Sequence, residues 1–103
     1  MKESPVTYEI TATVRPDLCD DYEHYMIERH IPDLLETGVF ERASLSRSSS
    51  GRYRVRYEAR NREALDLYLA EHADRLRQHF AETFPLGIEV SREEWVHLET
   101  WTV

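Results

Sequence analysis

Two segments of the chain alternate strictly between apolar and polar residues. In residues 6–14 every even position is apolar and every odd position is Thr or Glu. In residues 52–59 the odd positions are apolar and the even positions are charged. Side chains of a β-strand point alternately to opposite faces of a sheet, so each segment predicts a strand with one face for a core and one for water or a partner. The polar face would carry Glu9, Arg54, Arg56 and Glu58.

Apolar residues at helical spacing predict a helix after the first strand. We expect it to begin with Asp17 as its N-cap and to bury the stripe Leu18, Tyr22, Tyr25 and Met26. Pro32 has no N–H to donate and disfavours helical dihedral angles at Ile31, so a break is expected near residues 30–31. A short second turn would then end at Gly38.

A second helix is predicted for residues 62–84, with Asn61 as its N-cap. Its apolar stripe consists of Leu65, Tyr68, Leu69, His72, Leu76 and Phe80. Residues 40–47 predict another strand, with Ala43 and Leu45 turned toward the core.

The last strand lies within residues 88–103, and its apolar residues change parity. Ile88 and Val90 occupy even positions, whereas Trp95 occupies an odd one. Both sets can share one face only if the regular alternation is interrupted, so a β-bulge or a break is expected near residues 93–94.

The element order is βαββαβ, which implies two right-handed crossovers and places both helices on one face of an antiparallel sheet. The predicted fold class is therefore α+β and ferredoxin-like, with residues 1–103 forming one domain. In the expected strand order, 4-1-3-2, the first and third strands are central neighbours. Glu9 then lies opposite or diagonal to Arg54 or Arg56 on the open face of the sheet.

Charge and composition disfavour several classes of partner. The 103 residues include 20 acidic and 13 basic side chains, and the net charge of −7 disfavours nucleic-acid phosphates and anionic membranes. The single cysteine, Cys19, excludes an internal disulfide and fits a reducing compartment. The N-terminal residues lack the apolar core of a signal peptide, so a cytoplasmic location is expected.

Residues 51–57 occupy the place of an RNA-recognition signature in a domain with this element order. That signature presents aromatic rings on the open face, where they stack on bases. Here Tyr53 and Tyr57 have the parity of core residues, and the open face carries arginines instead. We therefore expect no nucleic-acid binding.

No residue pattern predicts a bound cofactor or metal. The pairs His24 with Glu28 and His72 with His79 have helical spacing, but neither pair has a third metal ligand at a persuasive distance. The chain also lacks a Gly-rich phosphate loop with its lysine. We therefore expect no bound cofactor and no bound metal.

Residues 28–40 read Glu-Arg-His-Ile-Pro-Asp-Leu-Leu-Glu-Thr-Gly-Val-Phe. They resemble the His-Ile-Pro-x-x-Leu-x-Thr-Gly-x-Phe segment of a family of small bacterial proteins of unknown function. Residues 57–59 and parts of residues 68–77 resemble the second half of that family's pattern. The family is similar to the dimeric α/β-barrel group, whose ferredoxin-like domains pack their open sheets face to face. That group includes cofactor-free monooxygenases, isomerases and haem-degrading enzymes, so the resemblance implies a homodimer but no particular activity.

The candidate ligand-binding residues are Glu9, Arg54, Arg56 and His30, and no catalytic residue is assigned. The open-face charges form either a lattice of cross-strand ion pairs sealed in a dimer or a cavity in which the arginines bind a small acidic ligand. His30 is either a general acid or base at the mouth of the sheet or a helix C-terminal cation bonded to free carbonyls.

Two functional classes remain. One is a homodimer that binds a small molecule or has a structural or regulatory role without catalysis. We favour it because no nucleophile, base–orienter pair or metal set is evident. The other is a cofactor-free monooxygenase- or isomerase-like enzyme acting on a small acidic or aromatic compound in a cavity on the open face. The apolar side chains within residues 95–103 predict that this tail packs on the second subunit.

Overall fold

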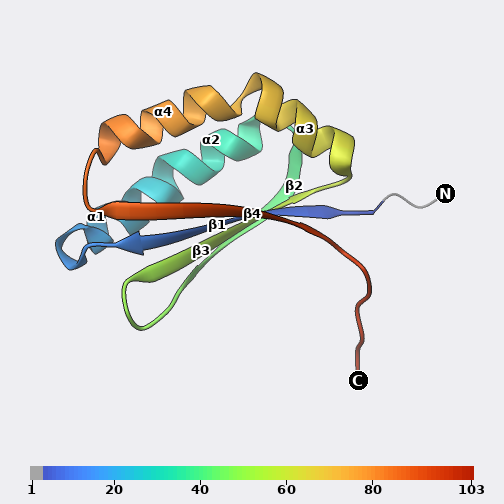
Figure 1. The fold of residues 1–103 in the computed structure, drawn as a ribbon, viewed down its shortest axis with the longest axis horizontal. Helices are drawn as coiled ribbons and strands as arrows, with labels where there is room; N and C mark the ends of the chain where they lie inside the picture. The colour runs from blue at the N-terminus through green and yellow to red at the C-terminus, as the bar shows by residue number, and fades with distance from the viewer. Residues whose placement is uncertain (1–3) are drawn as a thin grey trace.

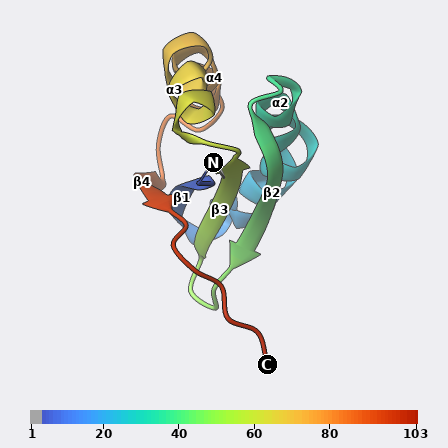
Figure 2. The same ribbon diagram turned by 90° about the vertical axis from the view of Figure 1, so that its right-hand side faces the viewer.

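The computed structural model describes residues 4–103. Four strands form one antiparallel sheet in the order β2-β3-β1-β4. They are β1 (Val6–Val14), β2 (Phe40–Arg47), β3 (Arg52–Ala59) and β4 (Ile88–Val96). The helices all lie on one face of this sheet, as Figures 1 and 2 show. The predicted βαββαβ order, the strand order and the α+β ferredoxin-like fold are confirmed.

The first helical layer is continuous. It consists of η1 (Pro16–Leu18), α1 (Cys19–Tyr25), η2 (Met26–His30) and α2 (Ile31–Glu36). The predicted break at residues 30–31 is wrong, because η2 is a π-helical turn that accommodates Pro32 at the start of α2. His30 and Ile31 keep helical dihedral angles, with φ of −68° and −64°. The layer ends before Gly38, whose φ of 78° confirms the predicted stop.

The two predicted helix caps have different outcomes. Asp17 does not cap α1, because its carboxylate accepts a 2.6 Å hydrogen bond from Nε of Arg15 and the helix begins without a side-chain cap. Asn61 caps α3 (Arg62–Glu71) by accepting a 2.9 Å hydrogen bond from the backbone N–H of Ala64. The predicted single second helix breaks at His72, where φ is −127°, and continues as α4 (Ala73–Thr83).

Strand β4 pairs with β1 in one continuous register, so the bulge or break predicted near residues 93–94 is wrong. The parity change is tolerated because residues 91–96 of this edge strand are all exposed. Trp95 therefore lies on the open face, whereas Arg92 lies on the side of the helices.

Strand β2 carries the irregular register instead. Its pairing with β3 shifts between Phe40 and Arg42, so one residue is inserted there. Beyond this shift Ala43 and Leu45 pair with residues of the core face, as predicted.

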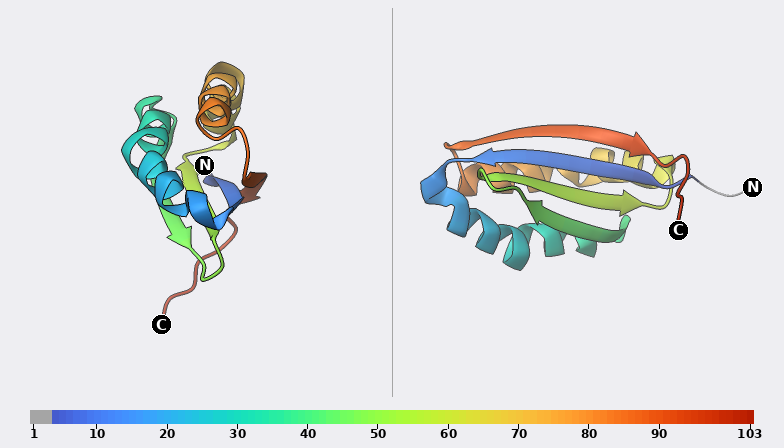
Figure 3. Two further views of the ribbon diagram at one scale, coloured as in Figure 1. Left: turned by 90° about the vertical axis from the view of Figure 1, so that its left-hand side faces the viewer. Right: turned by 90° about the horizontal axis from the view of Figure 1, so that it is seen from below.

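The core fills the space between the sheet and the two helical layers. Aromatic rings dominate it: the ring centroids of Phe40 and Tyr68 are 4.9 Å apart, and those of Tyr22 and Tyr53 are 4.7 Å apart. Most of the two predicted helix stripes is buried, at Tyr22, Tyr25, Met26, Leu65, Tyr68 and Leu76. The opposite face of the sheet, seen from below in Figure 3, is covered by no helix or strand of residues 4–103. No helix in that part of the chain is long and apolar enough to cross a membrane.

Candidate functional site

The open face, defined by Glu9, Arg54, Arg56 and Trp95, holds a charge cluster centred on one carboxylate. Glu9 pairs with Arg56 across the β1–β3 ladder, and its Oε1 atom is 3.1 Å from Nε of Arg56. The same Oε1 is 3.7 Å from Nε of Arg54, and the indole N–H of Trp95 donates to Oε2 at 3.1 Å. The Glu9 side chain is only 14% exposed, whereas about half of each arginine side chain is exposed. Glu9 is thus fully engaged by its own neighbours.

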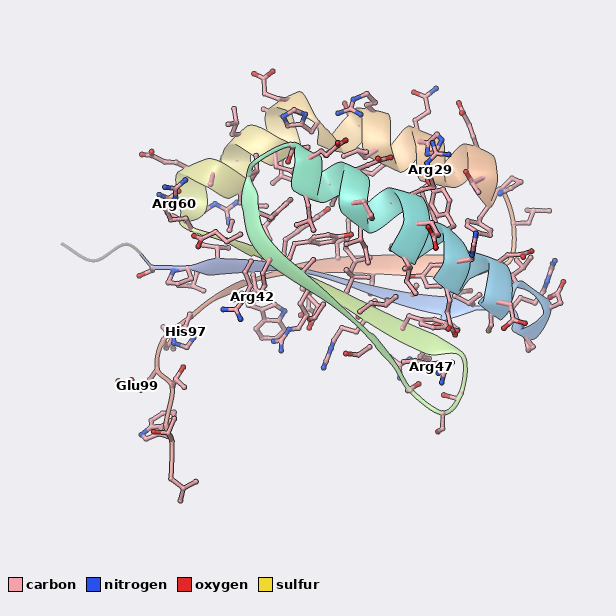
Figure 4. The ribbon with its side chains drawn as sticks, turned by 180° about the vertical axis from the view of Figure 1, so that it is seen from behind. Arg29, Arg42, Arg47, Arg60, His97 and Glu99 are labelled. Atoms are coloured by element: carbon pink, nitrogen blue, oxygen red, sulfur yellow. The ribbon has the colours of Figure 1, made fainter. Side chains whose placement is uncertain are left out.

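The rest of the open face is polar and has two open hollows, one of about 400 Å³ beside Glu9 and Arg54 and one of about 260 Å³ beside Arg56. Arg42 of β2 pairs with Glu58 of β3 at 2.8 Å, so another arginine is neutralised within the sheet. Arg42 and His97, which begins the tail, both lie below the sheet in Figure 4. The ion pairs of Glu9 with its two arginines and of Arg42 with Glu58 match the interpretation as a lattice of cross-strand ion pairs.

His30 lies on the other side of the sheet from Glu9, so the structure does not bring the four candidate residues together. It belongs to η2, is only 8% exposed, and contacts the rings of Tyr25 and Phe80. The interpretation as a helix C-terminal cation is wrong, because the helix continues through residue 36. A position at the mouth of the open face is also wrong, because His30 faces the interior between the sheet and the helices.

That interior contains a cavity of about 30 Å³, here called the helix-side cavity. Strands β1 and β4 form its floor, and the two helical layers form its walls. The lining residues are Tyr8, Ile10, Ala12, Tyr22, Met26, His30, Tyr68, Arg77, Phe80, Val90 and Arg92. A space of this size is about that of one water molecule in the liquid.

Two polar side chains at the helix-side cavity have buried atoms without partners. Nδ1 of His30 and Nε of Arg77 are buried and form no hydrogen bond with residues 4–103. Nη2 of Arg77 donates a 2.8 Å hydrogen bond to the hydroxyl of Tyr8, which ties α4 to β1. Leaving a buried donor or acceptor unpaired costs about 1–3 kcal/mol, so such atoms are uncommon in structures without a ligand or water to satisfy them.

The electrostatics of the helix-side cavity differ from those of the chain as a whole. Arg77 and Arg92 line it, no Asp or Glu does, and neither arginine forms an ion pair within residues 4–103. Burial lowers the pKa of His30 from 6.5 to about 4; nearby Asp33 opposes this effect, and the neighbouring His79 and Arg92 add to it. His30 is therefore neutral at pH 7, and one of its ring nitrogens can accept a proton or a hydrogen bond.

Tyr8, Arg77 and Arg92 were not predicted as site residues. Each carried a weak signal: Tyr8 is a core-parity residue with a polar tip, and Arg77 follows the buried Leu76 directly. Arg92 shares the even parity of Ile88 and Val90, which places it on the helix side of β4. Among residues 4–103, no group of three or more His, Cys, Asp or Glu residues is placed to hold a metal ion.

Comparisons with known proteins agree with this architecture. Residues 5–96 match the model of a family described as a domain of unknown function, DUF4286. A variant of SnoaB, a cofactor-independent oxygenase from Streptomyces nogalater, superposes with a TM-score of 0.74 at 17% identity, covering 93% of this chain and 95% of that chain. A dimeric ferredoxin-like protein from an uncultured marine organism superposes with a TM-score of 0.71 at 14% identity, covering 96% and 100%. No curated protein matches the chain.

At these identities the likeness to solved structures establishes the fold alone. A protein from Mycobacterium tuberculosis has the same fold, with a TM-score of 0.65 at 20% identity over 96% of this chain and 100% of that chain. Function has to be inferred from the site, because one fold carries many activities.

Proposed function

This chain belongs to the DUF4286 family, a domain of unknown function, and from its own residues we propose that it is a homodimer that binds a small molecule in the helix-side cavity. The observation that carries the proposal is the pair of buried, unpartnered polar atoms on His30 and Arg77 at one cavity. Apolar walls with a few convergent polar groups are typical of small-molecule sites. A ligand that pairs with these atoms would offset the free energy that their burial costs.

The size of the cavity sets how a ligand enters. About 30 Å³ holds one water, so a larger compound requires side chains at the rim to turn outward. Phe80 is half-buried and Arg92 is exposed, so we expect these two side chains to turn outward at the edge between α4 and β4. Entry there leaves the sheet and the buried His30 in place.

A titration followed by amide NMR tests the proposal. The parent protein is mixed in turn with small aromatic acids, aromatic amines and aliphatic acids, and we expect shifts centred on Tyr8, His30 and Arg77. Ala12→Val adds two methyl groups to the cavity wall and should abolish these shifts, because Ala12 lines the cavity and is only 1% exposed. The matched control Ala43→Val makes the same change on β2, which does not line the cavity, and should keep them. Shifts confined to the open face, or none with any compound, would overturn the proposal.

The homodimer part of the proposal rests on the open face and the tail. Trp95 is 49% exposed there, and Leu98 and Trp101 beyond it are 89% and 85% exposed, which is unusual for large apolar side chains unless a partner covers them. In Figures 1 and 2 the tail leaves β4 on the side of the sheet away from the helices. The open-face arginines already share Glu9, which favours a dimer interface over an anion-binding cavity on this face. Deleting residues 97–103, which follow the last strand residue, should weaken the dimer; an unchanged sedimentation mass would contradict this.

A cofactor-free enzyme is the second candidate, with a monooxygenase- or isomerase-like reaction on a small acidic or aromatic compound. Neutral His30 at the helix-side cavity favours it, because a buried imidazole can accept a proton from a bound compound. The expected site on the open face is replaced by the helix-side cavity in this hypothesis. Oxygen uptake and product analysis with each compound that binds would test it. If none of these compounds is turned over, the enzyme hypothesis fails and only the binding function remains.

A further inference from the structure

The charge of the helix-side cavity is opposite to that of the chain. The sequence has 20 acidic and 13 basic residues, yet the charged residues that line this cavity are Arg77 and Arg92. The other arginines near the sheet, such as Arg42 and Arg56, have carboxylates at 2.8 and 3.1 Å. Arg77 and Arg92 form no ion pair within 4.0 Å among residues 4–103, although Asp74 is near enough to help raise the pKa of Arg77.

The two arginines reach the cavity from different elements. Arg77 extends from α4 and is held in place by its 2.8 Å hydrogen bond to the Tyr8 hydroxyl on β1. Arg92 lies on the helix side of edge strand β4, directly opposite Ile10 of β1. A group bound between α4 and β4 is therefore within reach of donors from both sides, and guanidinium groups bind carboxylate and phenolate oxygens well.

The remaining walls suit a flat apolar body. The rings of Tyr22, Tyr68 and Phe80 line the cavity together with Ile10 and Val90. Aromatic side chains stack favourably on planar ligands and bury a large area. The lining contains no run of glycines and no lysine, which phosphate-binding loops use.

We infer that the helix-side cavity takes a small aromatic anion, with its charged oxygen at Arg77 and Arg92 and its ring against the aromatic wall. This inference rests on the proposed function and names its ligand class. Neutral His30 on η2 then accepts a hydrogen bond from a hydroxyl of the same compound. A phenol can therefore donate to His30, and a phenolate can accept from the arginines. The alternative is that Arg77 only supports Tyr8; it predicts no role for Arg92.

The charge preference can be measured with para-nitrophenol, whose phenolate absorbs visible light, and its methyl ether, which has nearly the same shape and no ionisable group. The groups that line the cavity or act on its lining residues and that carry charge or titrate are Tyr8, Tyr22, Tyr25, His30, Asp33, Tyr68, Asp74, Arg75, Arg77, His79 and Arg92. Because the arginines stabilise the anion, we expect the bound phenol to ionise at a lower pH than the free phenol. The phenolate should bind at least about tenfold more tightly than the ether, a difference that a single well-placed charge interaction can supply.

Arginine variants show whether these two side chains cause the preference. Arg77→Met and Arg92→Met keep an unbranched side chain but remove the charge and the guanidinium donors. Each should reduce phenolate affinity about tenfold and leave the affinity for the ether unchanged. Arg75→Met is the matched control, because Arg75 is exposed on the same helix and does not line the cavity. Arg77→Lys should restore part of the lost affinity, which a fold defect would not allow.

The possible outcomes separate this inference from the proposed function. Equal binding of phenolate and ether, or equal loss in Arg75→Met and Arg77→Met, would overturn the anion assignment while small-molecule binding stands. Binding of aliphatic acids or amines without either nitro compound would also overturn it. If no compound of any class enters the cavity, the proposed function itself fails.

Discussion

The two faces of the sheet carry arginines in opposite circumstances. On the open face Arg54 and Arg56 are about half exposed and share the carboxylate of Glu9. On the helix side Arg77 buries its Nε without a partner and donates only to a neutral hydroxyl. A partly exposed ion pair contributes about 0–1 kcal/mol, whereas burying an unpaired polar atom of a cation is costly. A charged side chain without a partner is therefore a better indication of a binding site than the mere presence of charged residues on a face.

The two faces also differ in how much of their apolar surface a single chain covers. The helix side is sealed by two helical layers and holds the buried residues of the core. The open face leaves Trp95 and the apolar side chains of the tail uncovered. One chain therefore builds a core and a cavity by itself, and we expect a second chain to cover the open face.

The largest effect on stability should come from a cavity-creating substitution in the core between the sheet and the helices. Leu65→Ala removes a side chain that is 0% exposed, and we expect a loss of about 2–5 kcal/mol in the free energy of unfolding. Leu67→Ala on the same helix is the control: its side chain is 51% exposed, so the change should stay within about 0.5 kcal/mol. Urea unfolding measures both. Equal losses would mean that the helix side is not packed as described.

Reversing the open-face charges should break the proposed homodimer. Arg54→Glu with Arg56→Glu leaves Glu9 without cations and places like charges beside it, so the dissociation constant should rise at least about a hundredfold. Arg29→Glu with Arg75→Glu changes the net charge equally on the exposed helical side, where Figure 4 shows Arg29, and should leave the dimer intact. Sedimentation velocity gives the masses. A dimer that survives the first pair would rule out this interface.

Acid should weaken the helix side through His30. Its pKa is about 4 in the folded protein, because burial disfavours the charged form, and near 6.5 in the unfolded chain. Between these values the unfolded chain binds more protons, so this contribution to stability is complete above pH 6.5 and is lost as the pH falls toward 4. The free energy of unfolding should decrease with a slope of up to about 1.4 kcal/mol per pH unit.

Two histidine variants isolate this effect. His30→Gln should flatten the dependence between pH 6.5 and 5, where most carboxylates remain ionised. His24→Gln should not, because His24 is exposed. Parallel pH curves for the parent and His30→Gln would show that His30 is not held neutral by the fold.

The smallest effect should come from two tyrosines on the core side of β3. The Tyr57 hydroxyl is buried without a hydrogen bond, so Tyr57→Phe should leave stability unchanged or raise it by up to about 1 kcal/mol. The Tyr53 hydroxyl donates to Glu23 at 2.6 Å, so Tyr53→Phe should lower stability by about 1 kcal/mol. Thermal unfolding at matched concentration compares them. A loss in Tyr57→Phe as large as that in Tyr53→Phe would reveal a partner for its hydroxyl.

Much of the fold could be predicted because its signals are local. The alternation in β1 and β3 placed Glu9, Arg54 and Arg56 on one face, and Asn61 was correctly identified as a cap. The errors occurred where packing overrides local preference. The π-helical turn η2 accommodates Pro32 within a continuous helical layer that packs on the sheet. Strand β4 keeps one register because its hydrogen-bonded pairing with β1 outweighs the burial of individual side chains.

The candidate site was less predictable. Only His30 of the four predicted residues lies at the helix-side cavity, and its expected roles placed it elsewhere. Tyr8, Arg77 and Arg92 come from three elements, each following its own periodicity. A cavity arises where such elements pack imperfectly, and no local pattern encodes it.

The sequence alone therefore determined the order of the elements, the strand neighbours and the two-sided character of the sheet, because side-chain parity and helical spacing follow from backbone geometry. Which charges are satisfied depends instead on contacts between elements that are distant in the sequence. Glu9 contacts Arg54 and Arg56 across the β1–β3 ladder, whereas Arg77 donates from α4 to Tyr8 and the exposed Arg92 lies on the helix side of β4. Those distances depend on how the helical layers settle on the sheet, which is a property of the whole packed chain.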